Sequence, residues 1–345
     1  MRGRLVGLLG SLVLLVVAGA CSRSKEGAQQ AGGSDAGGTQ AAAQVARVKL
    51  ALNWVPEPEF GGFYAARDQG AFKRHGLEVE ILGGGVGVPV LQMVATGQVE
   101  FGIVGGDELL TARARGVDLI PLFAVYQTSP QAIMVHASRG AKGIQDVLSS
   151  GTIALEPGLP YAAWLKKKYG FDKVKVVPYD GGVAQFVTNK DFAQQCFITS
   201  EPIAARRQGA DPVVFLVADE GFNPYSAVVV TRREMWKEQP ERVKNFVAAV
   251  REGWRAYLDN PAPANAVMGK LNTTLDAETF AAAAQAQKPL IETEETRTQG
   301  LGFMSRTRWE TLGRQLVELG LLEKAPAPDE FLLPEFTQAA GKGSP

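Results

Sequence analysis

The feature that most limits the folds open to this chain is a regular alternation of apolar, strand-like runs with helix-like runs. Helix signals follow the first three runs: Gly61-Gly62 opens a helix to about Arg74, Pro89 suits the first turn of the next, and Asp107 can cap a third. Strand–helix–strand order predicts a mostly parallel sheet with helices on both faces. The four predicted strands are 48–52, 77–81, 101–104 and 119–126.

The same alternation returns in the middle of the chain, after which the pattern becomes almost entirely helical. Two extended apolar runs, 132–135 and 227–230, bracket this middle block. One topology fits: a first lobe of residues 46–131 plus 226–345, and a second lobe of residues 132–225. The fold class is therefore α/β, with two lobes that each contain a mainly parallel sheet flanked by helices. Two chain crossings would form a hinge between the lobes.

The charge balance and the histidine and cysteine content exclude several functions. Lys plus Arg and Asp plus Glu both total 36, so the net charge is zero and no basic run favours a nucleic-acid partner. The chain contains two histidines and two cysteines, Cys21 and Cys196, without the spacing of a metal site. We therefore predict neither a metal nor a cofactor, and we interpret Cys196 as a small buried hydrophobic residue.

The N-terminus has the pattern of an export signal. Residues 1–20 combine a positive start, an apolar run and a final Ala-Gly-Ala, directly before Cys21. This pattern resembles a bacterial lipoprotein signal, which implies that Cys21 is lipidated and becomes the mature N-terminus. Ordinary cleavage near Ala20 is the alternative. Residues 21–45 are rich in Gly, Ala, Gln and Ser, which is typical of a flexible tether. We expect a body anchored by lipid on the periplasmic or extracytoplasmic face of the membrane.

Aromatic, acidic and glycine residues recur where the predicted strands end. Open α/β sheets bind ligands outside the carboxyl ends of their strands, so these residues are candidates for a binding cleft. Aromatic faces stack on rings, and carboxylates accept bonds from amine or ring N–H groups. Trp54 could instead be a core residue, and Asp107 could only cap its helix. The candidates at strand ends are Asn53, Trp54, Glu57, Glu59, Gly105, Asp107, Tyr126, Glu156, Tyr161, Asp180, Gly181 and Glu201.

Four stretches carry a family resemblance: LNWVPEPEFGGFYAARDQGAFKRHGLEVEI, VPVLQMVATGQVEFGIV, TIALEPGLPYAAWLKKKYGF and FITSEPIAARRQGADP. They resemble the type II periplasmic binding proteins, in the branch that binds alkanesulfonate, nitrate, taurine and thiamine-pyrimidine precursors. The resemblance spans about residues 46–325. It implies a two-lobed receptor that captures a small solute and docks on the permease of an ABC importer in the inner membrane. We expect a monomer.

The first loop departs from the pyrimidine-precursor pattern Trp-x-Pro-Asn-Pro-Asn-His. Glu57 and Glu59 replace the two asparagines, and Phe60 replaces the histidine. The resemblance implies that Trp54 and Tyr64 help to enclose the ligand ring, and that Glu201 bonds to an aminopyrimidine edge. The two added carboxylates favour a neutral or cationic, donor-rich heterocycle if they face the cleft.

Three alternatives remain open at this point, and one of them is a periplasmic sensor whose body docks on a kinase. A receptor for alkanesulfonate, nitrate or taurine has the same fold. The family also includes a fungal enzyme that makes the thiamine pyrimidine from its own histidine, and Phe60 occupies that position here. Since the histidine is missing, we predict a binding protein without catalytic residues.

Overall fold

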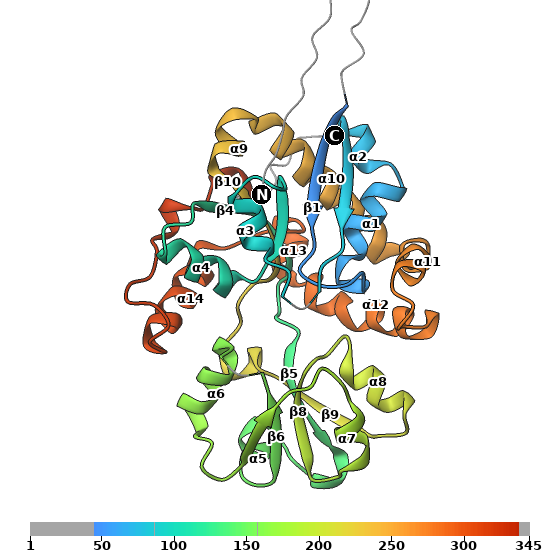
Figure 1. Cartoon of the computed structure of the whole chain (residues 1–345), viewed down its shortest axis with the longest axis vertical. Helices are drawn as coiled ribbons and strands as arrows, with labels where there is room; N and C mark the ends of the chain where they lie inside the picture. The colour runs from blue at the N-terminus through green and yellow to red at the C-terminus, as the bar shows by residue number, and fades with distance from the viewer. Residues whose placement is uncertain (1–44, 86, 157, 338–345) are drawn as a thin grey trace, which may run out of the picture. The chain divides into compact units, whose positions relative to one another are not determined.

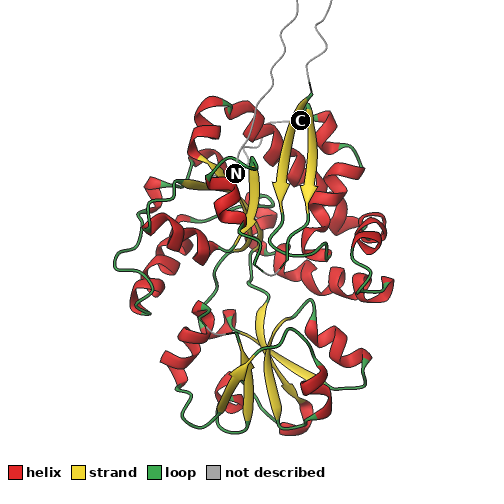
Figure 2. Ribbon diagram, viewed as in Figure 1, coloured by secondary structure: helices red, strands yellow, loops and turns green. Residues whose placement is uncertain are grey.

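The computed structural model describes residues 45–337 except 86 and 157, all within one compact unit, Ala43–Pro345. The predicted signal peptide, Cys21 and nearly all of the predicted tether lie outside the described residues. Strands form two groups, each flanked by helices (Figure 2). No helix in the described part of the chain combines the length and apolar character that a membrane crossing needs.

The first sheet, sheet A, has the strand order β2-β1-β3-β10-β4. Strand β1 pairs in parallel with β2 and β3, while β10 runs antiparallel to both β3 and β4. All eight residues of β4 are buried, as expected for a strand covered on both faces. The bounds are β1 Ala46–Ala51, β2 Leu77–Leu82, β3 Phe101–Val104, β4 Leu119–Tyr126 and β10 Ser226–Arg232.

The second sheet, sheet B, repeats this arrangement in the order β7-β6-β8-β5-β9. Here β6 pairs in parallel with β7 and β8, and β5 runs antiparallel to β8 and β9. Each sheet is therefore mixed but mainly parallel: four of its strands run in one direction, and only β10 in sheet A or β5 in sheet B runs against them. These two strands belong to the segments that pass between the two sheets. The bounds are β5 Gln131–His136, β6 Thr152–Leu155, β7 Lys175–Pro178, β8 Phe192–Phe197 and β9 Pro212–Leu216.

Helices cover both sheets, and their bounds follow in chain order. Those before β10 are α1 Gly61–Asp68, α2 Ala71–Arg74, α3 Val90–Ala95, α4 Gly106–Ala114, α5 Ile144–Val147, α6 Pro160–Tyr169, α7 Ala184–Thr188 and α8 Glu201–Arg207. Those after it are α9 Arg233–Glu238, α10 Pro240–Asp259, α11 Ala262–Leu271, α12 Ala277–Ile291, α13 Glu294–Gln299, α14 Arg306–Glu318 and α15 Pro334–Thr337. Short 3₁₀ turns are η1 Pro58–Phe60, η2 Ala137–Arg139, η3 Ala218–Glu220 and η4 Pro328–Glu330.

Two predicted elements differ in detail from the structure. The helix expected from Gly61 to about Arg74 is broken into α1 and α2 at Gly70, whose φ of 78° lies in the left-handed region. Gly105, not Asp107, is the N-cap of α4, so Asp107 lies in the first turn.

Helices α1 and α10 pack closely against each other over sheet A (Figure 1). A Cβ atom placed on Gly253 would lie 2.3 Å from the carbonyl oxygen of Gly62 and 2.4 Å from the Cβ of Ala66. The two helices can approach this closely only because position 253 has no side chain. This contact fixes the position of the start of α1 relative to α10, and with it the position of the loop that precedes α1.

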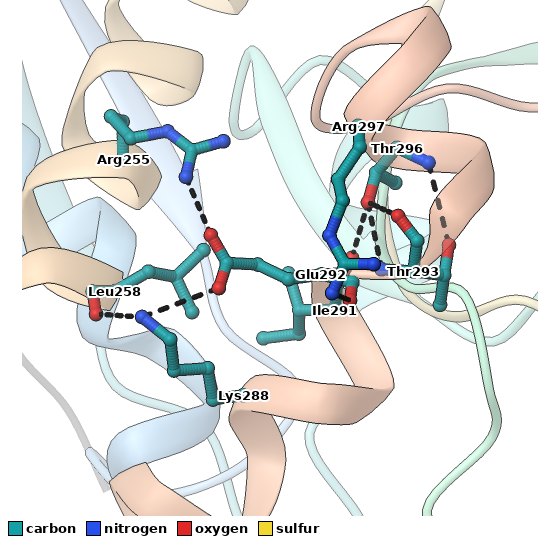
Figure 3. A network of polar contacts seen from close by, with 8 residues as sticks. All are labelled: Arg255, Leu258, Lys288, Ile291, Glu292, Thr293, Thr296 and Arg297. Atoms are coloured by element: carbon teal, nitrogen blue, oxygen red, sulfur yellow. Dashed lines mark hydrogen bonds and ion pairs between the residues drawn. The ribbon is translucent and has the colours of Figure 1, made fainter.

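A polar network ties the end of α12 to its neighbours (Figure 3). The Glu292 carboxylate accepts a bond of 2.5 Å from Arg255 of α10 and lies 3.2 Å from Lys288 Nζ. Lys288 also donates to the carbonyl of Leu258 at 2.6 Å. These contacts fix α12 against α10, and α12 in turn supports the candidate site.

Arg308 of α14 links the two segments that connect the sheets. Its guanidinium donates to the carbonyls of Gln127 and Asn223, one on each connecting segment. The same group lies over the Tyr225 ring, 3.9 Å from its centre. One side chain therefore fastens both crossings to the sheet-A region.

Candidate functional site

One cavity is lined by residues from both sheet regions. It collects six of the residues predicted from the sequence, and they come from η1, from the starts of α4 and α6, from the segment after β1 and from the end of β4. These six are Asn53, Glu59, Gly105, Asp107, Tyr126 and Tyr161. Further apolar and hydroxyl groups complete the lining, among them Ser129, Gln131, Phe197, Phe222 and Ser226.

Gln287 of α12 braces the first wall of the cavity. Its Nε2 donates to the carbonyl of Pro58 at 2.8 Å, and its Oε1 accepts the Tyr126 hydroxyl at 2.7 Å. Both the Gln287 and the Tyr126 side chains are fully buried. Because one amide contacts both η1 and the end of β4, it fixes the position of η1, which carries Glu59, relative to the Tyr126 side chain.

Gln195 of β8 performs the equivalent role in the sheet-B region. Its Oε1 accepts the backbone N–H of Glu156 at 2.5 Å and also the hydroxyl of Tyr161. The start of α6 and the Tyr161 ring are thereby fixed to the neighbouring strand. The pair Gln194-Gln195 between apolar residues is the signal in the sequence that could have indicated it, since buried polar side chains need hydrogen-bond partners.

Glu201 already has donors from its own region for both carboxylate oxygens. Oε1 accepts the Tyr179 hydroxyl and Oε2 accepts the backbone N–H of Phe197, each at 2.7 Å. Glu201 is not among the cavity-lining residues. It stands behind the lining, where it supports Phe197.

Acidic groups dominate the electrostatics of the site. Burial, followed by the repulsion of Glu57 and Glu201, raises the pKa of Glu59 to about 8. Burial and the charge of Glu201 raise the pKa of Glu57 to about 7, although a hydrogen bond from Trp54 acts in the opposite direction. Burial also raises the pKa of Asp107. Among the described residues, the lining includes no Lys, Arg or His.

The other predicted site residues lie outside the cavity lining. Trp54 is 40% exposed, whereas Tyr64 is 1% exposed because it points into the core from α1, below the Arg67 guanidinium. Glu57 is half-buried, and Glu156 is exposed.

Asp180 and Gly181 belong to the turn before α7. The Asp180 carboxylate accepts the backbone N–H of Gly182 at 3.1 Å and the side-chain amide of Gln185 at 3.0 Å. Both Asp180 and Gly181 are exposed. Their contacts thus stabilise a turn rather than reach the cavity.

A protein-family model described as NMT1/THI5 like matches residues 57–264, more than half of the chain. The chain belongs to the NMT1/THI5-like family. The resemblance predicted from the sequence is thereby confirmed.

Curated relatives of this NMT1/THI5-like protein include binding proteins and synthases. A riboflavin-binding protein from Chloroflexus aurantiacus is 26% identical, over 95% of this chain and 96% of the relative. A formylaminopyrimidine-binding protein from Halalkalibacterium halodurans is 22% identical, over 76% and 82%. A 4-amino-5-hydroxymethyl-2-methylpyrimidine phosphate synthase from Legionella pneumophila is 24% identical, over 81% and 88%.

The fold of this NMT1/THI5-like chain matches that of a periplasmic binding protein. The aliphatic sulphonate-binding protein SsuA from Escherichia coli aligns with a TM-score of 0.65 and 16% identity, over 87% of this chain and 95% of that protein. The predicted α/β fold of the periplasmic-binding-protein type is thus confirmed. At this level of identity the match shows the fold alone.

Proposed function

We propose that this protein is the substrate-binding component of an ABC importer, and that it captures an uncharged aromatic heterocycle in the cavity described above. The composition of the lining carries this proposal: aromatic side chains supply stacking surface, and Asn53, Glu59 and Asp107 supply polar groups. Such a lining is typical of pockets for small organic ligands, in which a few polar groups fix the orientation of the ligand.

The charge of the lining argues against an anionic ligand. A sulfonate or phosphate needs Arg, Lys or aligned N–H groups around it. The described lining instead contains two acids and no Lys, Arg or His, so it offers no positive charge to compensate a buried anion. An alkanesulfonate receptor is therefore the weaker alternative.

Riboflavin is our first candidate ligand. The riboflavin-binding relative aligns over 95% of this chain, and the formylaminopyrimidine-binding relative points to a related ring class. Both kinds of ligand have a flat ring for stacking and a polar edge with N–H donors. Two of the three relatives described above are named binding proteins, and Phe60, at the histidine position of the fungal enzyme, is fully buried, which supports binding rather than catalysis.

Titration of the full chain with riboflavin, followed by calorimetry and flavin fluorescence, tests the function. We expect saturable one-to-one binding of riboflavin and none of ethanesulfonate. Tyr161→Ala should weaken binding about tenfold or more through the loss of an aromatic contact. Tyr169→Ala, at the far end of the same helix and outside the lining, is the matched control. Binding of ethanesulfonate without binding of riboflavin or an aminopyrimidine would contradict the proposal.

We also propose that Cys21 anchors the protein by lipid to the extracytoplasmic face of the membrane, where the ligand-bound body docks on the permease as a monomer. The leader pattern before Cys21 and the tether composition of residues 21–45 support this arrangement. Membrane fractionation of a Cys21→Ser variant tests the anchor, since a variant that stays in the membrane fraction argues against lipidation.

A further inference from the structure

We propose that Glu59 binds the ligand as a neutral carboxylic acid and thereby selects an uncharged lactam or imide ring. The O–H of the acid would donate to a ring C=O, and the C=O of the acid would accept the adjacent ring N–H. This inference rests on the proposed function and names the ligand chemistry of the same cavity.

The geometry leaves the Glu59 carboxyl available for a ligand. Its backbone is fixed in η1, since Phe60 N–H bonds to the carbonyl of Glu57 and Gln287 holds the carbonyl of Pro58. The side chain lines the cavity. Within the described part of the chain, no hydrogen-bond donor contacts this carboxyl. In contrast, both oxygens of Glu201 have donors.

The groups around Glu59 favour its neutral form. Glu57 lies in the same loop, Glu201 approaches from α8, and Tyr126 approaches from β4. Asp107 of α4 lines the same cavity, and Gln287 of α12 is uncharged. No cation of the described lining offsets these acids. Ionisation of Glu59 would add a negative charge to a buried, already acidic site, so its pKa rises to about 8.

The protonation state decides which ligands Glu59 can bind. A protonated carboxyl is donor and acceptor at once, whereas a carboxylate only accepts. A lactam or imide edge presents an N–H beside a C=O, so it matches the neutral acid with two parallel hydrogen bonds. Riboflavin carries such an edge. A cationic amine would instead prefer the ionised form.

The experiment compares riboflavin dissociation constants of the wild type, Glu59→Gln and the surface control Glu234→Gln between about pH 6 and about pH 9. Glutamine keeps one donor and one acceptor without titrating, so Glu59→Gln should bind within about threefold of the wild type at neutral pH. The wild type should weaken by up to about tenfold per pH unit above about pH 8, since one proton is lost. Glu59→Gln should show a flat profile, and Glu234→Gln should follow the wild type.

The possible outcomes separate the two proposals. If the wild type binds riboflavin with a flat pH profile, or tighter as the pH rises, the neutral-acid inference is overturned and the receptor function stands. A loss of more than about thirtyfold in folded Glu59→Gln at neutral pH also overturns it, because glutamine preserves the pairing. If no variant binds riboflavin at any pH, the flavin proposal fails and the inference fails with it.

A second readout needs no ligand. Because the pKa of Glu59 is raised by folding, its ionisation opposes folding as the pH rises from the unfolded value near 4.5 towards about 8. The stability of the wild type relative to Glu59→Gln should therefore fall between about pH 5 and about pH 8 in urea unfolding. A constant difference between the two proteins would overturn the neutral state of Glu59.

Discussion

Gln287 shows how one side chain can set the geometry of the whole cavity. Its amide is fully buried and bonds to the carbonyl of Pro58 and to the hydroxyl of Tyr126. Without it, two buried polar groups would lose their hydrogen-bond partner, and each such loss costs about 1–3 kcal/mol. The residue therefore contributes both to stability and to the placement of two cavity walls.

We expect Gln287→Leu to lower the free energy of unfolding by about 2–4 kcal/mol, and Tyr126→Phe by about 1–2 kcal/mol, in urea titrations. In the double variant the shared hydrogen bond is already absent, so its cost should fall short of the sum of the single costs. Gln315→Leu is a matched control, since Gln315 donates to the carbonyl of Gly221 away from Tyr126. Its cost should add to that of Tyr126→Phe. Additivity of Gln287→Leu with Tyr126→Phe would argue against the shared bond.

The sequence predicts residues near strand ends far better than residues that support them. Asn53 and Glu59 lie in the segment that follows β1, so the rule for open sheets points to them. Gln287 lies 229 positions from Pro58 within an ordinary helical pattern, and no local signal marks it. Tyr64 was placed in the site by resemblance, whereas the helix turns it into the core. Local patterns therefore locate the cavity but not the direction of each side chain.

At the level of elements, the contact between α1 and α10 depends on a missing side chain. The periodicity of 240–258 predicts the apolar face of α10, and Val243, Phe246 and Trp254 are indeed fully buried. Periodicity does not reveal which residue of that face touches α1. Gly253 does so, and its lack of a Cβ sets the distance between the helices.

Gly253→Ala should destabilise the protein by about 1–3 kcal/mol, because the added methyl overlaps the backbone of α1. Alanine is more favourable than glycine in a helix interior by about 1 kcal/mol. The steric clash therefore has to cost more than this gain for the free energy of unfolding to fall. Gly269→Ala in α11 is the control, since its Cβ would have ordinary contacts at 3.7 Å. Thermal unfolding of both variants and the wild type measures the effect. A melting temperature of Gly253→Ala equal to or higher than that of the wild type would refute the close contact.

At the level of the whole folded unit, two ion-pair groups join the sheet-A and sheet-B regions. Arg207 of α8 pairs with Asp276 and Glu278 at the start of α12. Lys167 of α6 lies 3.5 Å from the Glu318 carboxylate of α14. Exposed pairs of this kind contribute little to the free energy of folding, because water and salt screen them. If the connecting segments act as the predicted hinge, the pairs would still favour a closed form over an open one, because they exist only while the two regions are in contact.

We expect the double variant Arg207→Gln, Lys167→Gln to weaken riboflavin binding about three- to tenfold and to widen the ligand-free protein in small-angle scattering. High salt should weaken binding by the wild type more than by this variant, since salt screens exposed pairs. Lys244→Gln removes an ion pair inside α10 and serves as the control. If the double variant has the same riboflavin affinity and the same ligand-free dimensions as the wild type, these ion pairs do not stabilise a closed form.

The position of β10 has a consequence for how the protein is made. This strand lies between β3 and β4, although nearly a hundred residues of sheet B separate it from β4 along the chain. During synthesis, β3 and β4 therefore lack the strand that pairs with both of them until Ser226–Arg232 has been translated. All strands of sheet B have been translated by then. Sheet A therefore receives the first strand of the chain, β1, but is completed only after sheet B, by β10.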